Sequence, residues 1–146
     1  MRTRIIYGFI ITMIFLSACR KSDAPELPDG LQKAPIPQFT VDSSVDLTIP
    51  GQDPSSFNGK FTLNQYYTND HTFKSMDVVV RKSGDNSMVK VLQADVQQLP
   101  VTISITGDQL KTLFGAPIQS IDFYDIGADV TLLAGQKIEA FPSDGN

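Results

Sequence analysis

The sequence predicts an all-β fold, an antiparallel sandwich of about seven strands with one short connecting helix. After residue 38 the apolar residues recur mostly at every second position, which is the spacing of strands with one buried face. Turn-forming residues interrupt these runs about every ten residues, as in sandwiches built from short strands. One stretch, 106–115, departs from this period and has the spacing of a helix.

The first half of the domain contains four expected strands. Residues 45–49 alternate apolar and polar side chains, and residues 60–66 form a second expected strand. The runs 76–80 and 88–92 flank Ser83-Gly84-Asp85-Asn86, whose residue types tolerate the left-handed backbone of a hairpin turn. We therefore expect these two runs to pair as a hairpin.

A short helix is expected after the fifth strand, which covers residues 101–105. Thr106 and Gln109 have the spacing of a capping box, in which each side chain bonds to the backbone of the other residue. Apolar residues within 110–114 follow at helical spacing, and Gly115 is placed to end the helix. The helix then forms the connection between the fifth and sixth strands.

The longest alternation covers residues 124–132. Its even-numbered residues, among them Ile126, Ala128 and Val130, are expected to face the core. Its odd-numbered polar residues are expected to face water, and they include Asp125, Asp129 and Thr131. A turn then leads to the last expected strand, 138–142. Seven short strands with this turn spacing are typical of an immunoglobulin-like sandwich over residues 39–146.

Residues 1–18 have the parts of a secretory signal peptide in the right order. Arg2 and Arg4 precede the apolar run 5–16, and small residues follow it. A helix of that run would rise only about 18 Å, against the roughly 30 Å of a bilayer's hydrocarbon core, so the signal peptide is favoured over a permanent span. Residues 19–38 follow, with several prolines and no period, and are expected to form an extended tether.

Leu16-Ser17-Ala18-Cys19 resembles the bacterial lipobox. The resemblance implies that diacylglycerol is attached to the Cys19 thiol, that the chain is cleaved before this residue and that the new amino terminus is acylated. Two or more acyl chains would anchor the protein stably, because each buried methylene contributes about 0.8 kcal/mol to membrane affinity. Cys19 is therefore interpreted as a lipidation site that links the protein to the membrane.

Composition excludes several classes of function. The chain of 146 residues has a formal net charge of −4, which argues against nucleic acid as a partner because phosphates need a basic patch. With one Cys, one His and no Trp, it lacks the residues for a zinc site of several Cys and His ligands or for a disulfide scaffold. No cofactor is expected.

Catalysis is not expected either. His71 is the only candidate for a general base near neutral pH, and no Gly-x-Ser-x-Gly nucleophile motif accompanies it. Asp125 and Asp129 would lie about 13 Å apart on one strand, beyond the roughly 5 to 9.5 Å that glycosidase carboxylates use. Calcium binding by these two residues with Asp122 remains an alternative, although no EF-hand spacing is present.

The candidate binding residues lie between the second and third expected strands. Tyr66, Tyr67 and Phe73 provide aromatic faces, and His71 lies among polar neighbours in the same connection. Aromatic rings on loops can stack on sugars or contact a protein partner. The alternative is that these rings pack at the end of the sandwich, and exposure in a structure would distinguish the two.

The lipobox, the tether, the hairpin 78–86, the helix 106–115 and the segment 125–129 together resemble an Ig-like domain of Bacteroidetes outer-membrane lipoproteins. Such domains often accompany glycan-uptake systems of the Sus type. The resemblance implies a non-enzymatic module, anchored in the outer membrane on its cell-surface or periplasmic face, that binds a glycan or another outer-membrane protein. The alternative is a structural spacer or protein-interaction domain without a small-molecule ligand.

Overall fold

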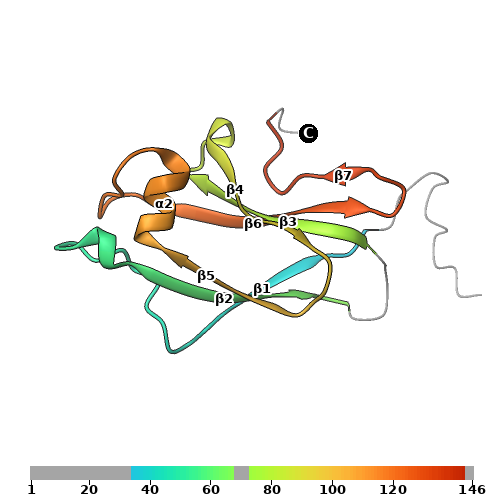
Figure 1. The fold of residues 1–146 in the computed structure, drawn as a ribbon, viewed down its shortest axis with the longest axis horizontal. Helices are drawn as coiled ribbons and strands as arrows, with labels where there is room; N and C mark the ends of the chain where they lie inside the picture. Colours follow the sequence, from blue (N-terminus) through green and yellow to red (C-terminus); the bar gives the residue numbers. More distant parts are fainter. Residues whose placement is uncertain (1–33, 68–72, 144–146) are drawn as a thin grey trace, which may run out of the picture. The chain divides into compact units, whose positions relative to one another are not determined.

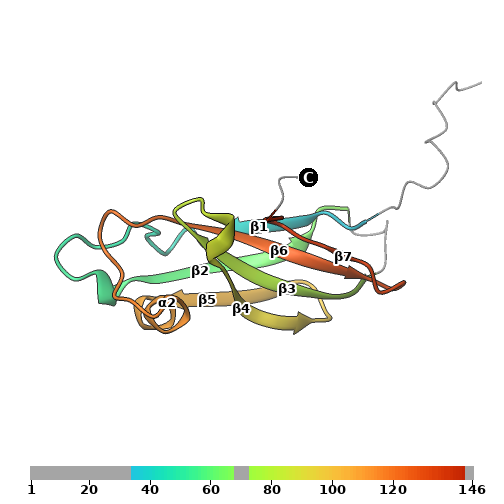
Figure 2. The ribbon, with the colours of Figure 1, turned by 90° about the horizontal axis from the view of Figure 1, so that it is seen from above.

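The computed structural model describes residues 34–67 and 73–143, which form two antiparallel sheets packed face to face (Figure 1, Figure 2). The three-stranded sheet has the order β1-β2-β5, with β1 at Pro37–Val41, β2 at Asn58–Gln65 and β5 at Val101–Thr106. The four-stranded sheet has the order β4-β3-β6-β7, with β3 at Phe73–Lys82, β4 at Val89–Val96, β6 at Tyr124–Leu132 and β7 at Lys137–Ile138. The predicted all-β sandwich is confirmed.

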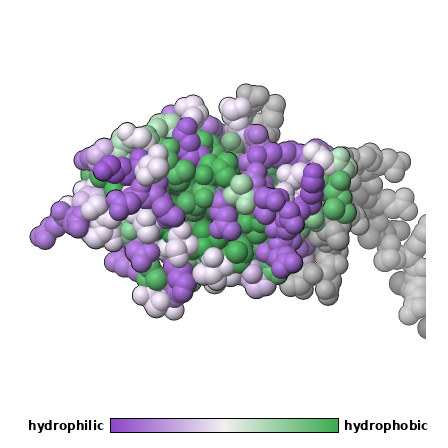
Figure 3. Space-filling view, in the orientation of Figure 1, coloured by the Kyte–Doolittle hydropathy of each residue, from purple (hydrophilic) through white to green (hydrophobic). Residues whose placement is uncertain are grey.

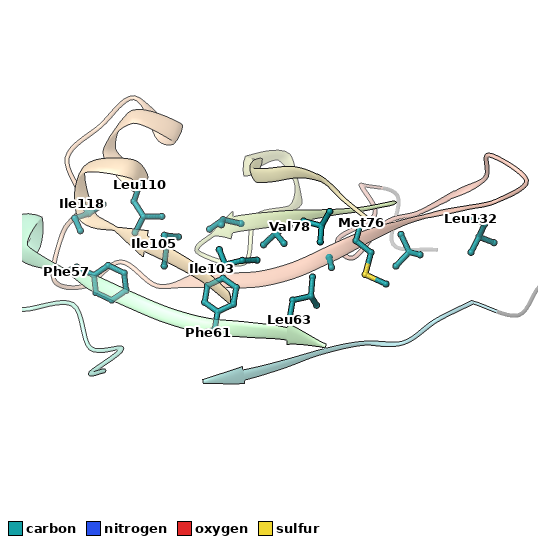
Figure 4. Packing of buried hydrophobic residues seen from close by; sticks show 14 residues of the cluster. Phe57, Phe61, Leu63, Met76, Val78, Ile103, Ile105, Leu110, Ile118 and Leu132 are labelled. Atoms are coloured by element: carbon teal, nitrogen blue, oxygen red, sulfur yellow. The ribbon is translucent and has the colours of Figure 1, made fainter. Parts of the chain in front are cut away.

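The hydrophobic core lies between the inner faces of the two sheets. Met76, Val78 and Val80 of β3 and Leu63 of β2 are fully buried in one cluster. Each such side chain stabilises the fold by about 1.5–3 kcal/mol relative to an exposed position. Figure 4 shows this cluster continuing toward the helix, where Leu110 joins it. The alternation of apolar residues thus builds the core that the sequence predicts.

The predicted hairpin joins β3 to β4. Ser83 and Gly84 have φ values of 53° and 72°, the left-handed backbone expected at this turn. A single turn of 3-10 helix follows at Asn86–Met88, and Asp85 caps its beginning. The Asp85 carboxylate accepts a hydrogen bond of 2.8 Å from the backbone N–H of Ser87. Turn chemistry encoded in four residues therefore positions two long strands.

The predicted helix is α2, Gly107–Phe114, between β5 and β6. The Thr106 side chain accepts from the Gln109 N–H at 3.2 Å, and the Gln109 side chain accepts from the Thr106 N–H at 2.8 Å. Gly115 ends the helix in the left-handed conformation, with φ 69°. Leu110 is the residue of α2 that enters the core, so the capping box and the helical spacing are both confirmed.

Residues 45–49 do not form the strand that their alternation predicts. They lie in the connection between β1 and β2, where the Asp42 side chain accepts from the Ser44 N–H at 3.0 Å. The Asp46 side chain likewise accepts from the Thr48 N–H, at 2.8 Å. These local bonds fold the backbone into turns, which compete with a strand ladder. The first strand is instead β1, which begins at Pro37, two residues before the expected start of the domain.

The expectation that Asp129 faces water is wrong. Asp129 is only 7% exposed, because the chain after β7 leaves the sheet edge and covers the outer face of β6. The backbone N–H of Ala140 donates to its carboxylate at 2.9 Å, and the Lys137 ammonium lies 3.0 Å away. The expected last strand 138–142 is correspondingly short, since β7 ends at Ile138.

Candidate binding groove

The predicted aromatic site is only partly assembled. Tyr66 and Tyr67 are 55% and 54% exposed, with ring centroids 4.7 Å apart and an interplanar angle of 84°. Phe73 is half-buried and packs against the core at the start of β3. His71 and Cys19, the expected lipidation site, lie outside the described residues. The two tyrosines therefore form an edge-to-face pair and do not present a flat aromatic platform with Phe73.

A larger apolar feature lies on the side of the sandwich between β1 and β6. Two adjoining cavities of about 340 and 490 Å³ share Leu47, Tyr124 and Ile126 in their walls. We call these two cavities the β1/β6 groove. The apolar residues that complete its lining are Phe39, Val41, Ile49, Phe57, Phe61, Ile105, Leu110, Phe123 and Phe141.

The groove exposes apolar surface that a closed sandwich would bury. Val41 is 49% exposed on β1, and Leu47 is also exposed in the connection that follows. A third cavity of about 390 Å³ continues the groove beneath Phe141 and Ile138. Figure 3 shows the opposite side of the sandwich, where β4 and α2 lie in front, and hydrophobic side chains flanked by hydrophilic residues reach the surface there as well. Contiguous exposed apolar surface of this kind is typical of a binding site.

An ion pair fixes one wall of the groove. The Arg81 guanidinium contacts the Asp125 carboxylate through Nε at 3.0 Å and Nη2 at 2.8 Å. Its Cζ lies 4.3 Å from the centroid of the Phe141 ring, which is a cation–π contact. Asn86 accepts from the same guanidinium and donates to the Pro142 carbonyl at 2.7 Å. These contacts hold the Phe141 ring in place beside β6.

A second polar cluster borders the groove at the beginning of β6. The Lys82 ammonium lies 2.8 Å from the Asp122 carboxylate, which also accepts from the Tyr124 hydroxyl at 3.3 Å. Burial raises the pKa of Tyr124 to about 12, and the Asp122 charge adds to this effect. The pKa of Asp122 is lowered, because hydrogen bonds from Lys82 and from the Gln119 N–H outweigh the opposing effect of burial.

The three aspartates considered for calcium do not converge on one site. Asp122 pairs with Lys82, Asp125 with Arg81 and Asp129 with Lys137. Within residues 34–67 and 73–143, no group of three His, Cys, Asp or Glu side chains could hold a metal ion. Each carboxylate instead neutralises a cation on a neighbouring strand. The groove is therefore an apolar surface whose bordering charges are neutralised within the protein.

The groove residues escaped the sequence interpretation because they come from distant segments. Phe39, Leu47, Ile126 and Phe141 meet only when β1 and β6 lie at the same side of the sandwich. One signal in the sequence was Leu47, which lies in a segment that alternates apolar and polar residues as a strand does. This segment does not pair with another strand in the described part of the structure. Only the tertiary structure shows that the Leu47 side chain lines a groove.

No protein-family model, curated protein or solved structure matches the chain. In the part that the structure describes, no helix is long and apolar enough to cross a membrane. The fold and the site therefore define the class directly: an antiparallel β-sandwich of seven described strands with an apolar groove along one side.

Proposed function

We propose that this protein is a lipid-anchored, non-enzymatic module that binds a partner protein at the outer membrane. The observation that carries the proposal is the β1/β6 groove, because it leaves apolar side chains of β1 and β6 accessible within an otherwise well-packed sandwich. The charged residues at the border of the groove form two ion pairs, Arg81 with Asp125 and Lys82 with Asp122. Because these charges are already neutralised, an apolar surface of a partner can pack against the groove.

The lipobox Leu16-Ser17-Ala18-Cys19 supports the location. A tether between Cys19 and β1, extended at about 3.1 Å per residue, would place the groove up to roughly 50 Å from the bilayer surface. That reach suits a module that captures a partner beside the membrane.

The strand order supports the immunoglobulin-like part of the proposal. Three strands face four, and the fifth and sixth strands are joined across the sandwich by α2. In a constant-type immunoglobulin domain the fourth strand belongs to the sheet of the first, second and fifth strands, whereas here β4 pairs with β3. The proposed relationship to Ig-like domains of Bacteroidetes lipoproteins therefore includes this difference in the placement of one strand.

A glycan is the second candidate ligand, as in accessory proteins of Sus-type uptake systems. The exposed rings of Tyr66 and Tyr67 favour it, since aromatic faces stack on sugars. Their edge-to-face arrangement leaves less flat surface than a coplanar pair would, so we rank the glycan below a protein partner. Binding to a glycan panel that is lost in a folded Tyr66→Ala, Tyr67→Ala double variant would reverse this order.

Two experiments test the proposed function. Cys19→Ala should release the protein from the membrane fraction or leave an unprocessed precursor, and a variant that is processed and stays membrane-bound would remove the anchor. A photoreactive amino acid at Val41 should crosslink to a specific envelope protein in cells. The matched control is Val91 on β4, which is 47% exposed but lies outside the groove. Equal crosslinking from both positions would contradict the groove as the binding site.

A further inference from the structure

The chain that precedes the sandwich is joined to it at one end of the two sheets. The first described residue, Ala34, leads directly into β1. At the same end, on the right in Figure 1, β2 finishes and β6 turns into β7, and the second view agrees (Figure 2). We call this the tether end of the sandwich. Its described connections are residues 34–36, 66–67, 97–100 and 133–136.

Four large apolar side chains are exposed at the tether end. Ile36 is 53% and Leu133 66% exposed, and Tyr66 and Tyr67 are each more than half exposed. The Tyr66 N–H donates to the Ile36 carbonyl at 2.9 Å, so these residues and the adjoining Tyr67 ring form one cluster beside the three-stranded sheet. Leu133 follows β6 and extends from the four-stranded sheet. We call these four the tether-end residues.

The tether-end residues form an exposed apolar surface and not a pocket. None of them lines any of the three cavities of the groove. Small ligands such as sugars bind in concave sites, whereas exposed aromatic and aliphatic side chains insert into the interfacial region of a bilayer. Tyrosine is enriched there because its ring is apolar and its hydroxyl is polar. Shape and residue type therefore favour a lipid surface as the occupant of this end.

Charge is distributed unequally between the two ends of the sandwich. The described connections of the tether end contain no charged residue. The opposite end, where β6 begins, carries six aspartates in its connections and in α2, some of them in ion pairs: Asp42, Asp46, Asp53, Asp85, Asp108 and Asp122. Charged side chains are costly to bring into a bilayer. The tether end can therefore contact lipid at a lower cost than the opposite end.

The position of the lipid anchor also favours the tether end. Ile121 and Phe123 are exposed at the opposite end, but they lie among the aspartates, and β6 separates the two ends by about 30 Å. Residues 19–33 span no more than roughly 50 Å even when fully extended, so acyl chains on Cys19 would keep the tether end within reach of the bilayer. Such confinement raises the effective concentration of the two surfaces, and a small apolar contact is then sufficient.

We propose that the tether end docks through the tether-end residues on the lipid bilayer in which Cys19 is anchored. The inference rests on the proposed function, because it takes the lipid anchor from it and adds a second lipid contact that fixes the orientation of the domain. The sandwich then stands on the bilayer with its aspartate-rich end pointing away. The β1/β6 groove lies along the side of the sandwich and stays open to a partner protein.

The chain has no Trp and one Cys, so single tryptophan probes can test the contact. The full chain is coupled through the Cys19 thiol to a maleimide-bearing lipid in phosphatidylcholine vesicles whose acyl chains carry bromine, which quenches tryptophan at contact. Leu133→Trp should lose most of its emission. Ile121→Trp is the matched control, because these exposed residues lie at opposite ends of β6, and it should keep its emission. Coupling anchors the chain whether or not cells acylate Cys19, so docking is tested separately from the Cys19→Ala fractionation.

A second set of variants tests whether the tyrosines make the contact. In the Leu133→Trp chain, Tyr66→Ser and Tyr67→Ser together should restore a large part of the lost emission, because they remove both rings from the lipid surface. Val91→Ser, a half-exposed position on β4 away from the tether end, is the control and should leave the quenching unchanged. Circular dichroism of each variant verifies that the sandwich is folded.

Several outcomes would overturn the proposal. Full emission from Leu133→Trp, equal quenching of Leu133→Trp and Ile121→Trp, or quenching that both tyrosine substitutions leave unchanged would show that the tether end does not dock on lipid. Quenching of a third probe, Val41→Trp, without quenching of Leu133→Trp would mean that the groove lies against the bilayer. Glycan binding that is lost in the Tyr66→Ala, Tyr67→Ala double variant would assign the tyrosines to a sugar.

Discussion

Lys137 of β7 bridges two carboxylates that stand directly opposite each other on β3 and β6. Its ammonium lies 3.0 Å from Asp129 and 3.4 Å from Asp77, which are paired in the strand register. Hydrogen bonding to Asp129 raises the pKa of Lys137 and outweighs the opposing effect of burial. Opposed like charges would destabilise the two strands, so the short strand β7 stabilises the sheet chiefly by supplying this cation.

Replacing Asp129 should therefore destabilise the domain. Asp129→Ala removes the nearer of the two carboxylates that pair with Lys137 and the acceptor of the Ala140 N–H, and we expect a loss of about 1–3 kcal/mol in the free energy of unfolding. Urea titration would measure it. Glu139→Gln, at an exposed position nearby, is the control and should change little. Equal losses in the two variants would show that the buried carboxylate has no special role.

Gly127 is required where the chain after β7 crosses β6. A Cβ at this position would lie 2.6 Å from the Ala140 Cβ and 3.0 Å from the Phe141 ring. Gly127→Ala should displace this segment and cost about 1–3 kcal/mol, as overpacking commonly does. Gly51→Ala, where a Cβ would meet nothing within 4 Å, is the matched control for thermal unfolding. If both variants melt at the same temperature, the segment moves aside at no cost.

The register of β6 can be tested with adjacent residues. Val130→Asp places an unpaired charge in the core, where Val130 is fully buried, and should unfold a domain whose total stability is about 5–15 kcal/mol. Thr131→Asp lies on the opposite face, paired with Lys137, and should cost little. Circular dichroism of both variants measures the difference. Two folded variants of similar stability would contradict the inward direction of Val130.

Tyr124 should make stability decrease at alkaline pH. Its pKa is raised from 10.0 to about 12 by burial and by Asp122, so the folded protein retains the phenolic proton more strongly than the unfolded chain. This contribution is complete below pH 10 and is lost as the pH rises from about 10 to about 12. The decrease should be smaller in Tyr124→Phe, measured by denaturation at several alkaline pH values. An identical pH dependence in the two proteins would contradict the shifted pKa.

Local features were predictable because short-range chemistry determines them. The turn at Ser83 and Gly84 follows from residues that tolerate positive φ, and the cap at Thr106 follows from two side chains three residues apart. The alternation in β6 likewise placed Ala128 and Val130 in the core. Each of these depends on neighbours within a few positions, so the sequence contains the whole cause.

The tertiary structure alone decided the features that depend on what lies beside a strand. Residues 45–49 alternate as a strand should, but side-chain bonds from Asp42 and Asp46 keep them in turns. Asp129 has the pattern of a solvated position, and it is buried because the chain returns over β6. The groove has the same origin: the chain after β7 leaves the sheet edge, so no strand pairs with the first half of β6 on that side, and Ile126 lines the groove together with Phe39 and Val41 of β1. Periodicity specifies which face of a strand is apolar, whereas the packing of distant segments decides whether that face and its edges are covered.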